Sequence, residues 1–168
     1  ILQSCDIYFY KTVQYYELDR LAQYFRLFGF GRITGIDIGR EYKGTIPNTA
    51  FMNKRYGRFG WSKGSLLNFC IGQGEILVTP IQVFNYVNLL ATKGNSNSPH
   101  LVSSPKKDSE NEIPLSSKIW DRIIFDMGQV ISHAKGTGKN ADPAIQGAKI
   151  YGKTGTAENP HGEDHAWF

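Results

Sequence analysis

The sequence predicts an α+β fold, with helices packed around a small antiparallel sheet. Apolar residues recur at helical spacing in four segments, near 6–15, 19–28, 79–94 and 117–134. Strand-forming residues gather near the carboxyl end, where a run through Ile150 and Tyr151 to Glu158 is followed by a turn and the start of a return strand at 165–168. A strand, a turn and a returning strand form an antiparallel pair.

Composition limits the classes of protein to consider. Hydrophobic residues make up 40% of the 168 positions, enough for the core of one domain or a large part of one. No run of about eighteen apolar residues occurs, so no membrane span is expected in this sequence. Two cysteines, Cys5 and Cys70, are too few for a disulfide framework. The chain lacks an initial Met and stops in mid-strand, so we expect a fragment truncated at both ends.

The first two predicted helices each follow a polar residue that can cap a helix. Ser4-Cys5-Asp6 precedes the aromatic run of the first helix, and Asp19 precedes the second, which Gly29 ends. Ser4 and Asp6 can serve as helix caps alone or as functional groups, and the local pattern is consistent with both.

The middle of the chain is predicted to be mostly irregular. Residues 30–38 indicate a loop and a short strand, and an irregular stretch continues to about Lys63. Basic and aromatic residues cluster at 54–61, as in a nucleic-acid or membrane-surface patch, but a solvated loop with aromatic anchors is favoured, and no nucleic-acid partner is predicted. Gly72-Gln73-Gly74 predicts a tight turn packed against another element.

The clearest helix start is Thr79-Pro80-Ile81-Gln82. Thr79 can cap the helix, Pro80 suits the first helical position, and Gln82 completes a capping box. The following polar stretch, 95–114, predicts a surface excursion around one short strand at 100–102. The last predicted helix, 117–134, has an apolar face that must pack in the same hydrophobic core as the helix beginning at Pro80. No domain boundary is therefore expected in the polar stretch 95–114.

Candidate functional residues concentrate in the strand that follows. Gly152 and Gly155 allow close approach to the backbone, and Lys153, Thr154 and Thr156 place one cation and two hydroxyls along one strand edge. This set suits an anionic ligand such as a carboxylate or a phosphate.

A nucleotide-binding alternative fits the same letters. Residues 147–154 match the P-loop pattern G-x-x-x-x-G-K-[ST]. A P-loop also needs a strand before its first glycine and a helix opening at the Lys-Thr pair, and Gly155 and Pro160 disfavour that helix. The P-loop is therefore the least favoured interpretation.

Metal sites are not predicted. His161 and His165 are four residues apart, but Pro160 and Gly162 disfavour the helix that would align them. No cysteine and histidine cluster has zinc spacing, and no cofactor is expected.

Four blocks of the sequence occur in the order of one known family. They are Ser4-Cys5-Asp6, Phe28-Gly29-Phe30-Gly31 with Thr34-Gly35-Ile36-Asp37, Gly72-Gln73-Gly74 with Thr79-Pro80-Ile81-Gln82, and the Lys153–Glu158 strand. With these blocks, the chain resembles the transpeptidase domain of class B penicillin-binding proteins, in particular its elongation-type members. The resemblance covers nearly the whole chain and is most specific in the block from Gly72 to Gln82 and in the Lys153–Glu158 strand. The Lys-Thr-Gly tripeptide alone is weak evidence, whereas the combination is specific. The resemblance implies a serine β-lactamase/transpeptidase-like fold, of which residues 1–168 are the carboxyl-terminal part.

The resemblance also implies a reaction and roles for individual residues. A serine attacks the penultimate D-Ala carbonyl of a peptidoglycan stem peptide, and β-lactams acylate the same serine. Ser4 would relay a proton, Lys153 would stabilise negative charge, and Thr154, Gly155 and Thr156 would bind the terminal carboxylate. The Thr156 N–H would form half of an oxyanion hole, a donor worth about 3 kcal/mol of barrier. Asp6 stands where the family motif has Asn, and it cannot donate as an amide does.

The family's Ser-x-x-Lys motif has no counterpart in a helical context. The letter matches at 103–107 contain Pro105 and follow the second motif instead of preceding it. We therefore expect the nucleophile to lie upstream of Ile1 and the chain alone to be inactive. Alternatives are a serine β-lactamase or β-lactam sensor of the same fold and a non-catalytic cell-wall scaffold.

The family further implies partners and a location. Stem peptides and β-lactams are the expected ligands, and a glycan polymerase with the elongation machinery is the expected assembly. The family implies the periplasmic face of the inner membrane, reached through an anchor outside this chain.

Overall fold

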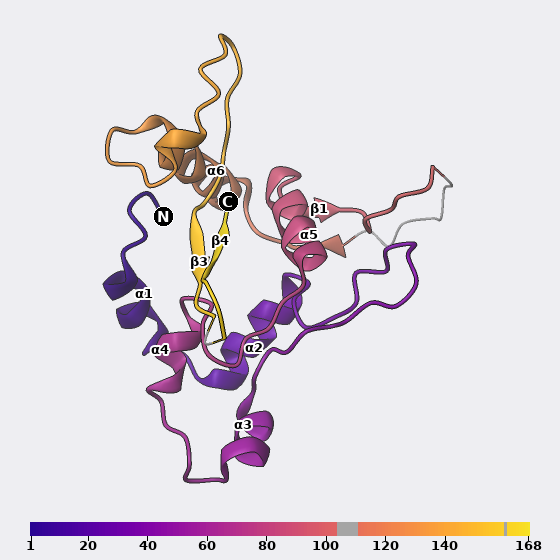
Figure 1. The fold of residues 1–168 in the computed structure, drawn as a ribbon, viewed down its shortest axis with the longest axis vertical. Helices are drawn as coiled ribbons and strands as arrows, with labels where there is room; N and C mark the ends of the chain where they lie inside the picture. The colour runs from indigo at the N-terminus through magenta and orange to yellow at the C-terminus, as the bar shows by residue number, and fades with distance from the viewer. Residues whose placement is uncertain (104–110, 160) are drawn as a thin grey trace. The chain divides into compact units, whose positions relative to one another are not determined.

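The computed structural model describes residues 1–103, 111–159 and 161–168 (Figure 1). In this part of the chain, short helices dominate, and two small sheets each consist of one antiparallel strand pair. The elements are α1 (Asp6–Val13), α2 (Leu18–Leu27), α3 (Thr49–Tyr56), α4 (Ser65–Phe69), α5 (Pro80–Ala91), β1 (Asn95–Ser96), β2 (Asn111–Glu112), α6 (Ser117–Ser132), the 3-10 helix η1 (Lys139–Ala141), β3 (Gly155–Ala157) and β4 (His165–Trp167). The α+β prediction is confirmed.

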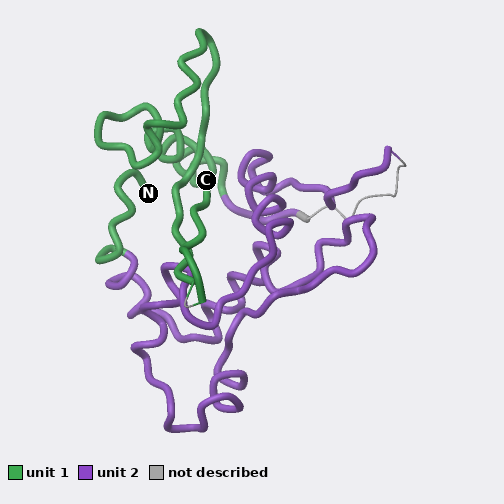
Figure 2. Tube along the Cα trace, in the orientation of Figure 1, with its two compact units in different colours: residues 1–8, 116–168 green, residues 9–115 purple. Residues whose placement is uncertain are grey.

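The chain divides into two compact units (Figure 2). The smaller unit combines residues 1–8 with 116–168, and the larger unit comprises residues 9–115. The boundary near the amino end falls within α1. The smaller unit therefore joins the first residues of the chain to its last strands.

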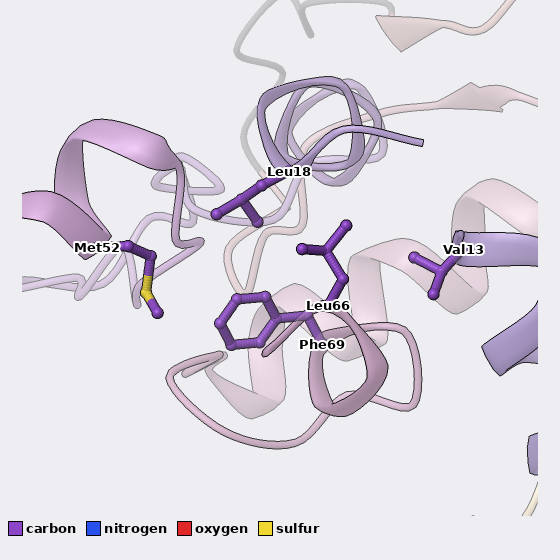
Figure 3. Packing of buried hydrophobic residues seen from close by; sticks show 5 residues of the cluster. All are labelled: Val13, Leu18, Met52, Leu66 and Phe69. Carbon is purple, nitrogen blue, oxygen red and sulfur yellow. The ribbon is translucent and has the colours of Figure 1, made fainter. Parts of the chain in front are cut away.

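The core of the larger unit lies among α2, α3 and α4 and the end of α1. Its buried side chains are Val13, Leu18, Met52, Leu66 and Phe69 (Figure 3). Phe69 and Met52 are each only 1% exposed. Burying such side chains supplies the main favourable term for folding, at about 1.5–3 kcal/mol each.

Helix α5 begins as its sequence predicts. The Thr79 hydroxyl accepts from the Gln82 N–H at 3.3 Å, and Gln82 Oε1 accepts from the Thr79 N–H at 3.0 Å. Gln82 is buried, and its Nε2 also donates to the carbonyls of Arg32 (2.6 Å) and Lys43 (2.9 Å). One amide therefore caps α5 and ties two loops to its start.

The predictions of a short strand within residues 30–38 and of another at 100–102 are wrong. Neither segment enters a sheet, because a side chain replaces the backbone ladder. Asp37 Oδ1 accepts from the Leu101 N–H at 2.7 Å, and Oδ2 accepts from the Val102 N–H at 2.8 Å. These two hydrogen bonds lower the pKa of Asp37.

Asp19 was predicted to cap the second helix, and this assignment is also wrong. Glu17 occupies the N-cap position of α2, and Asp19 lies in the first turn. The Asp19 carboxylate accepts from the Thr49 N–H at 2.8 Å. It thus satisfies a donor at the start of α3 instead of one in its own helix.

The stretch predicted to be irregular contains α3, and α4 begins at Ser65, just after its end at about Lys63. Asn48 caps α3 by accepting from the Phe51 N–H at 2.8 Å, a signal that the sequence carries directly after Pro47. In the basic and aromatic segment at its end, Arg55 lies 5.5 Å from the centre of the Tyr56 ring. Trp61 Nε1 donates to Asn53 Oδ1 at 2.8 Å, which fits a loop with an aromatic anchor.

The smaller unit contains α6, η1 and the β3–β4 hairpin. Gly155 pairs with Trp167, Thr156 with Ala166 and Ala157 with His165, so the predicted return strand is confirmed. Asn159 organises the connection, since its N–H donates to Asp164 Oδ1 at 3.1 Å. Helix α6 buries Val130 and Ile131.

Some sequence features fall outside the described residues. They are Pro160 in the predicted turn and most of the two Ser-x-x-Lys letter matches at 103–107. Within the described ranges, every helix is too short or too polar to cross a bilayer.

Candidate active site

Ser4 lies in the turn that leads into α1. Its N–H donates to the Ile1 carbonyl at 3.3 Å, and its φ of 46° places it in the left-handed region. Non-glycine residues seldom adopt this conformation, and those that do concentrate at functional sites. Helix α1 begins at Asp6, two residues later, so Ser4 is not the residue adjoining the helix.

Lys153 is positioned by the residue before it. Gly152 is buried, and its N–H donates to the Met127 carbonyl of α6 at 3.3 Å. A Cβ built on Gly152 would lie 2.6 Å from Cζ of the Phe168 ring, closer than any real contact. Glycine lets the Phe168 ring lie against the backbone here, and a larger residue would force the ring to shift.

The structure brings Lys153 and Ser4 together. Lys153 Nζ donates to the Ser4 hydroxyl and, at 2.5 Å, to the Thr154 carbonyl. Burial lowers the pKa of Lys153 below its ordinary 10.5, and the negative charge of Asp6 offsets part of this shift. The Ser4 hydroxyl is thus engaged by a cation whose proton is easier to give up.

Asp6 lies in the first turn of α1 and is exposed. Its carboxylate acts on Lys153 through its charge, which favours the ammonium form. An Asn at this position would offer an N–H donor and no charge, so the replacement changes the electrostatics around Lys153.

Thr154, Gly155 and Thr156 follow Lys153 into the hairpin. Strand β3 begins at Gly155, and Thr156 is exposed on it. The Thr154 hydroxyl donates to the Thr137 hydroxyl at 2.8 Å. The carboxylate-binding role of these three residues stays a prediction.

Thr137 is the partner that sequence analysis missed. It lies between Gly136 and Gly138 after α6, and a Cβ on Gly138 would lie 2.8 Å from Ile131 Cδ1. The two glycines permit a close turn that carries a hydroxyl to Thr154. The Gly-Thr-Gly tripeptide was the available signal.

The contact between Lys153 and Ser4 allows proton transfer. A hydroxyl held by an ammonium can pass its proton to a neighbouring base and regain one from the nitrogen. The adjacent strand edge offers further N–H and O–H donors for an anion.

The other candidate sites are a metal centre and a nucleotide-binding loop. Three or more His, Cys, Asp or Glu side chains do not gather into a metal-binding group anywhere in the described ranges. After the P-loop letters at 147–154, strand β3 begins at Gly155, where a P-loop would start a helix. The P-loop interpretation is therefore wrong.

Comparison with known sequences gives a consistent result. The family described as the penicillin binding protein transpeptidase domain matches residues 1–168. The chain is 34% identical over 193 aligned positions to the peptidoglycan D,D-transpeptidase MrdA of Haemophilus influenzae, with 100% of this chain and 29% of that protein covered. For MrdA of Escherichia coli K12, the identity is 31%, and the shares are 93% and 26%. The chain thus spans less than a third of these relatives.

Solved structures agree with the sequence comparison. A complex of penicillin-binding protein PBP2 with MreC from Helicobacter pylori is similar with a TM-score of 0.88 and 33% identity, covering 99% of this chain and 31% of that one. Pseudomonas aeruginosa PBP2 in complex with WCK 5153 has a TM-score of 0.83 and 34% identity, covering 96% and 37%. The expected transpeptidase fold is confirmed: the chain belongs to the penicillin-binding protein transpeptidase domain family and is similar to its PBP2/MrdA members.

Proposed function

We propose that this chain is the carboxyl-terminal part of a serine D,D-transpeptidase domain that cross-links peptidoglycan stem peptides. The observation that carries the proposal is the hydrogen bond from Lys153 Nζ to the Ser4 hydroxyl. Two motifs from opposite ends of the chain meet there, in a family whose relatives bear the name transpeptidase.

The reaction assigns each residue one task. A serine outside residues 1–168 attacks the penultimate D-Ala carbonyl carbon and gives its proton to the lysine of its own Ser-x-x-Lys motif, and the C–N bond to the terminal D-Ala breaks. Ser4 gives its proton to the leaving amine and receives one from Lys153. An amine of a second stem peptide then attacks the acyl-enzyme, its proton returns through Ser4 to Lys153, and the serine leaves and regains its proton from the motif lysine.

The strand edge is proposed to hold the substrate. Thr154 and Thr156 bind the terminal carboxylate of the donor peptide through their hydroxyls, and Gly155 lets the peptide approach the backbone. The Thr156 N–H and the N–H of the nucleophile stabilise the oxyanion. A β-lactam enters the same place, because its carboxylate and carbonyl imitate those of the peptide.

The cellular setting follows from the same relatives. We propose that the complete protein works at the periplasmic face of the inner membrane with a glycan polymerase and the elongation machinery. The Helicobacter pylori structure, described as a PBP2–MreC complex, supports an elongation assembly.

Intact-mass spectrometry of the complete protein with benzylpenicillin tests the proposal. We expect one covalent adduct on a serine outside residues 1–168, formed about 10²–10⁴-fold more slowly in Lys153→Ala. Lys149→Ala, which removes an exposed lysine four residues earlier, is the control and should react normally.

Three other results would contradict the proposal. An adduct within residues 1–168 would place the nucleophile in this chain. Rapid turnover of the penicillin would indicate a β-lactamase. An unmodified protein that also leaves stem peptides unprocessed would indicate a scaffold.

A further inference from the structure

The larger unit contains a cavity at the carboxyl end of α2. Its volume is about 210 Å³, and its lining includes Arg26, Arg32, Ile33, Asn85, Leu89 and Ser96. At roughly 30 Å³ for each water molecule, it has room for about seven waters or one small metabolite. Ile33, at its rim, is 64% exposed, so the cavity is open to solvent.

Three buried side-chain atoms of this lining, in Thr34, Asn85 and Ser96, make no hydrogen bond to any residue that the structure describes. Asn85 Oδ1 and Ser96 Oγ are buried, and neither makes a hydrogen bond to any described group. Ser96 is only 3% exposed and belongs to β1, whose backbone pairs with β2. Buried polar groups are nearly always hydrogen-bonded, so both atoms call for a partner inside the cavity.

Two arginines, Arg26 and Arg32, line the same cavity. Arg26 Nη2 donates to the Ile46 carbonyl at 3.2 Å, which fixes the side chain and leaves its other N–H groups available. The Arg32 main chain is held by its carbonyl, which accepts from Gln82 Nε2 at 2.6 Å. Two positive charges are thus held on segments fixed by separate hydrogen bonds.

The Glu41 carboxylate lies close to the lining of the cavity, beside Thr34. Glu41 accepts from the Thr34 N–H and from the Gly35 N–H at 3.0 Å. Burial works to raise the pKa of Glu41, but the hydrogen bonds from the Thr34 and Gly35 N–H groups lower it, so the group stays ionised. Its oxygens face the backbone, and two guanidinium groups outnumber its single charge.

We propose that this cavity binds a small amino or hydroxy acid. Arg26 and Arg32 hold the carboxylate, because guanidinium groups match its two oxygens. The neighbouring ammonium or hydroxyl group donates to Asn85 Oδ1 and Ser96 Oγ. A short side chain packs against Leu89 and Ile33. The proposal is independent of acyl transfer, since it requires only binding.

Calorimetric titration of the complete protein tests this assignment. Alanine and lactate are the probes, and propionate, which lacks the donor group, is the comparison ligand. We expect alanine or lactate to bind and propionate to bind at least about tenfold more weakly. Equal binding of propionate, or the absence of binding by both probes, would overturn the proposal.

A matched pair of arginine variants separates the cavity from general charge. Arg32→Gln removes a guanidinium from the lining, and Arg40→Gln removes an exposed one that is not part of it. We expect Arg32→Gln to weaken binding of the better probe about tenfold or more and Arg40→Gln to leave it unchanged. Equal losses in both variants would show nonspecific attraction and would overturn the site. Penicillin acylation should be the same in both variants.

Ser96→Ala tests the proposal through the melting temperature as well as through binding affinity. If the hydroxyl has no partner in the free protein, its removal should leave the melting temperature unchanged or higher. The better probe should raise the melting temperature of the unmodified protein but not that of the variant. A clear loss of stability without ligand would mean that the hydroxyl is already bonded and would contradict the proposal.

Discussion

Lys153 Nζ donates a hydrogen bond to the Ser4 hydroxyl across 149 positions of sequence. Both residues belong to the smaller unit, in which the first eight residues join the carboxyl-terminal strands. Because the two residues are so distant in sequence, the fold alone brings them into contact. Substituting each residue in turn measures what this contact contributes to the reaction rate and to stability.

The first prediction concerns the coupling of this pair. In the complete protein, Ser4→Ala and Lys153→Ala should each slow penicillin acylation or stem-peptide transfer, because each breaks the same proton path. The double variant should be no slower than the worse single variant, as expected for residues that act as a unit. Rate constants for the four proteins decide the matter, and additive losses would show that the two residues act separately.

The second prediction concerns the pH dependence of stability. Burial lowers the folded-state pKa of Lys153, so the unfolded chain binds more protons between that pKa and the ordinary 10.5. The free energy of unfolding should rise with pH across this window, relative to that of Lys153→Met. Below the folded pKa, both states are protonated and the difference should be constant.

Urea unfolding at a series of pH values measures this difference. Lys149→Met removes an exposed lysine and controls for the loss of one charge. A difference between the unmodified protein and Lys153→Met that falls as pH rises would mean that the ammonium is stabilised by folding, contrary to the effect of burial.

The third prediction concerns the packing that positions Lys153. Gly152→Ala would place a methyl group 2.6 Å from the Phe168 ring, and it should destabilise the protein by about 1–3 kcal/mol. Acylation should slow as well, since Lys153 is the next residue. Gly39→Ala is the matched control, because a Cβ there meets nothing within 4 Å. Thermal unfolding that is the same for both variants would refute the packing argument.

The fourth prediction concerns Gln82. Gln82→Leu keeps a similar volume but removes the donors to the Arg32 and Lys43 carbonyls and the capping acceptor for Thr79. We expect a loss of about 3 kcal/mol in the free energy of unfolding. Gln23→Leu on the exposed side of α2 should change stability by less than about 0.5 kcal/mol. Denaturant unfolding compares the two, and equal effects would be inconsistent with a buried network.

Local chemistry explains what the sequence predicted well. The start of α5 was predictable because Thr79, Pro80 and Gln82 satisfy the helix terminus with residues three positions apart. The β3–β4 hairpin was predictable because strand formers flank a turn. In both cases, the groups that decide the structure are neighbours in the chain.

Long-range partners explain what the sequence did not predict. The Asp37 carboxylate accepts hydrogen bonds from residues 64 and 65 positions away, where the local pattern predicted strands. The Asp19 carboxylate accepts from the Thr49 N–H, where the local pattern predicted a cap of its own helix. Spacing gave no sign that Thr154 would meet Thr137. The sequence pattern marked Ser4 and Lys153 as candidates and the family resemblance gave them roles, whereas their contact came from the fold.

The left-handed backbone at Ser4 sets two requirements against each other. Glycine would adopt this conformation without steric cost, yet it would remove the hydroxyl that Lys153 engages. Selection of variants for thermostability alone should therefore enrich Ser4→Gly, while selection for cell growth should restore Ser4. At this position, the amino acid that gives the greatest stability differs from the one that activity requires.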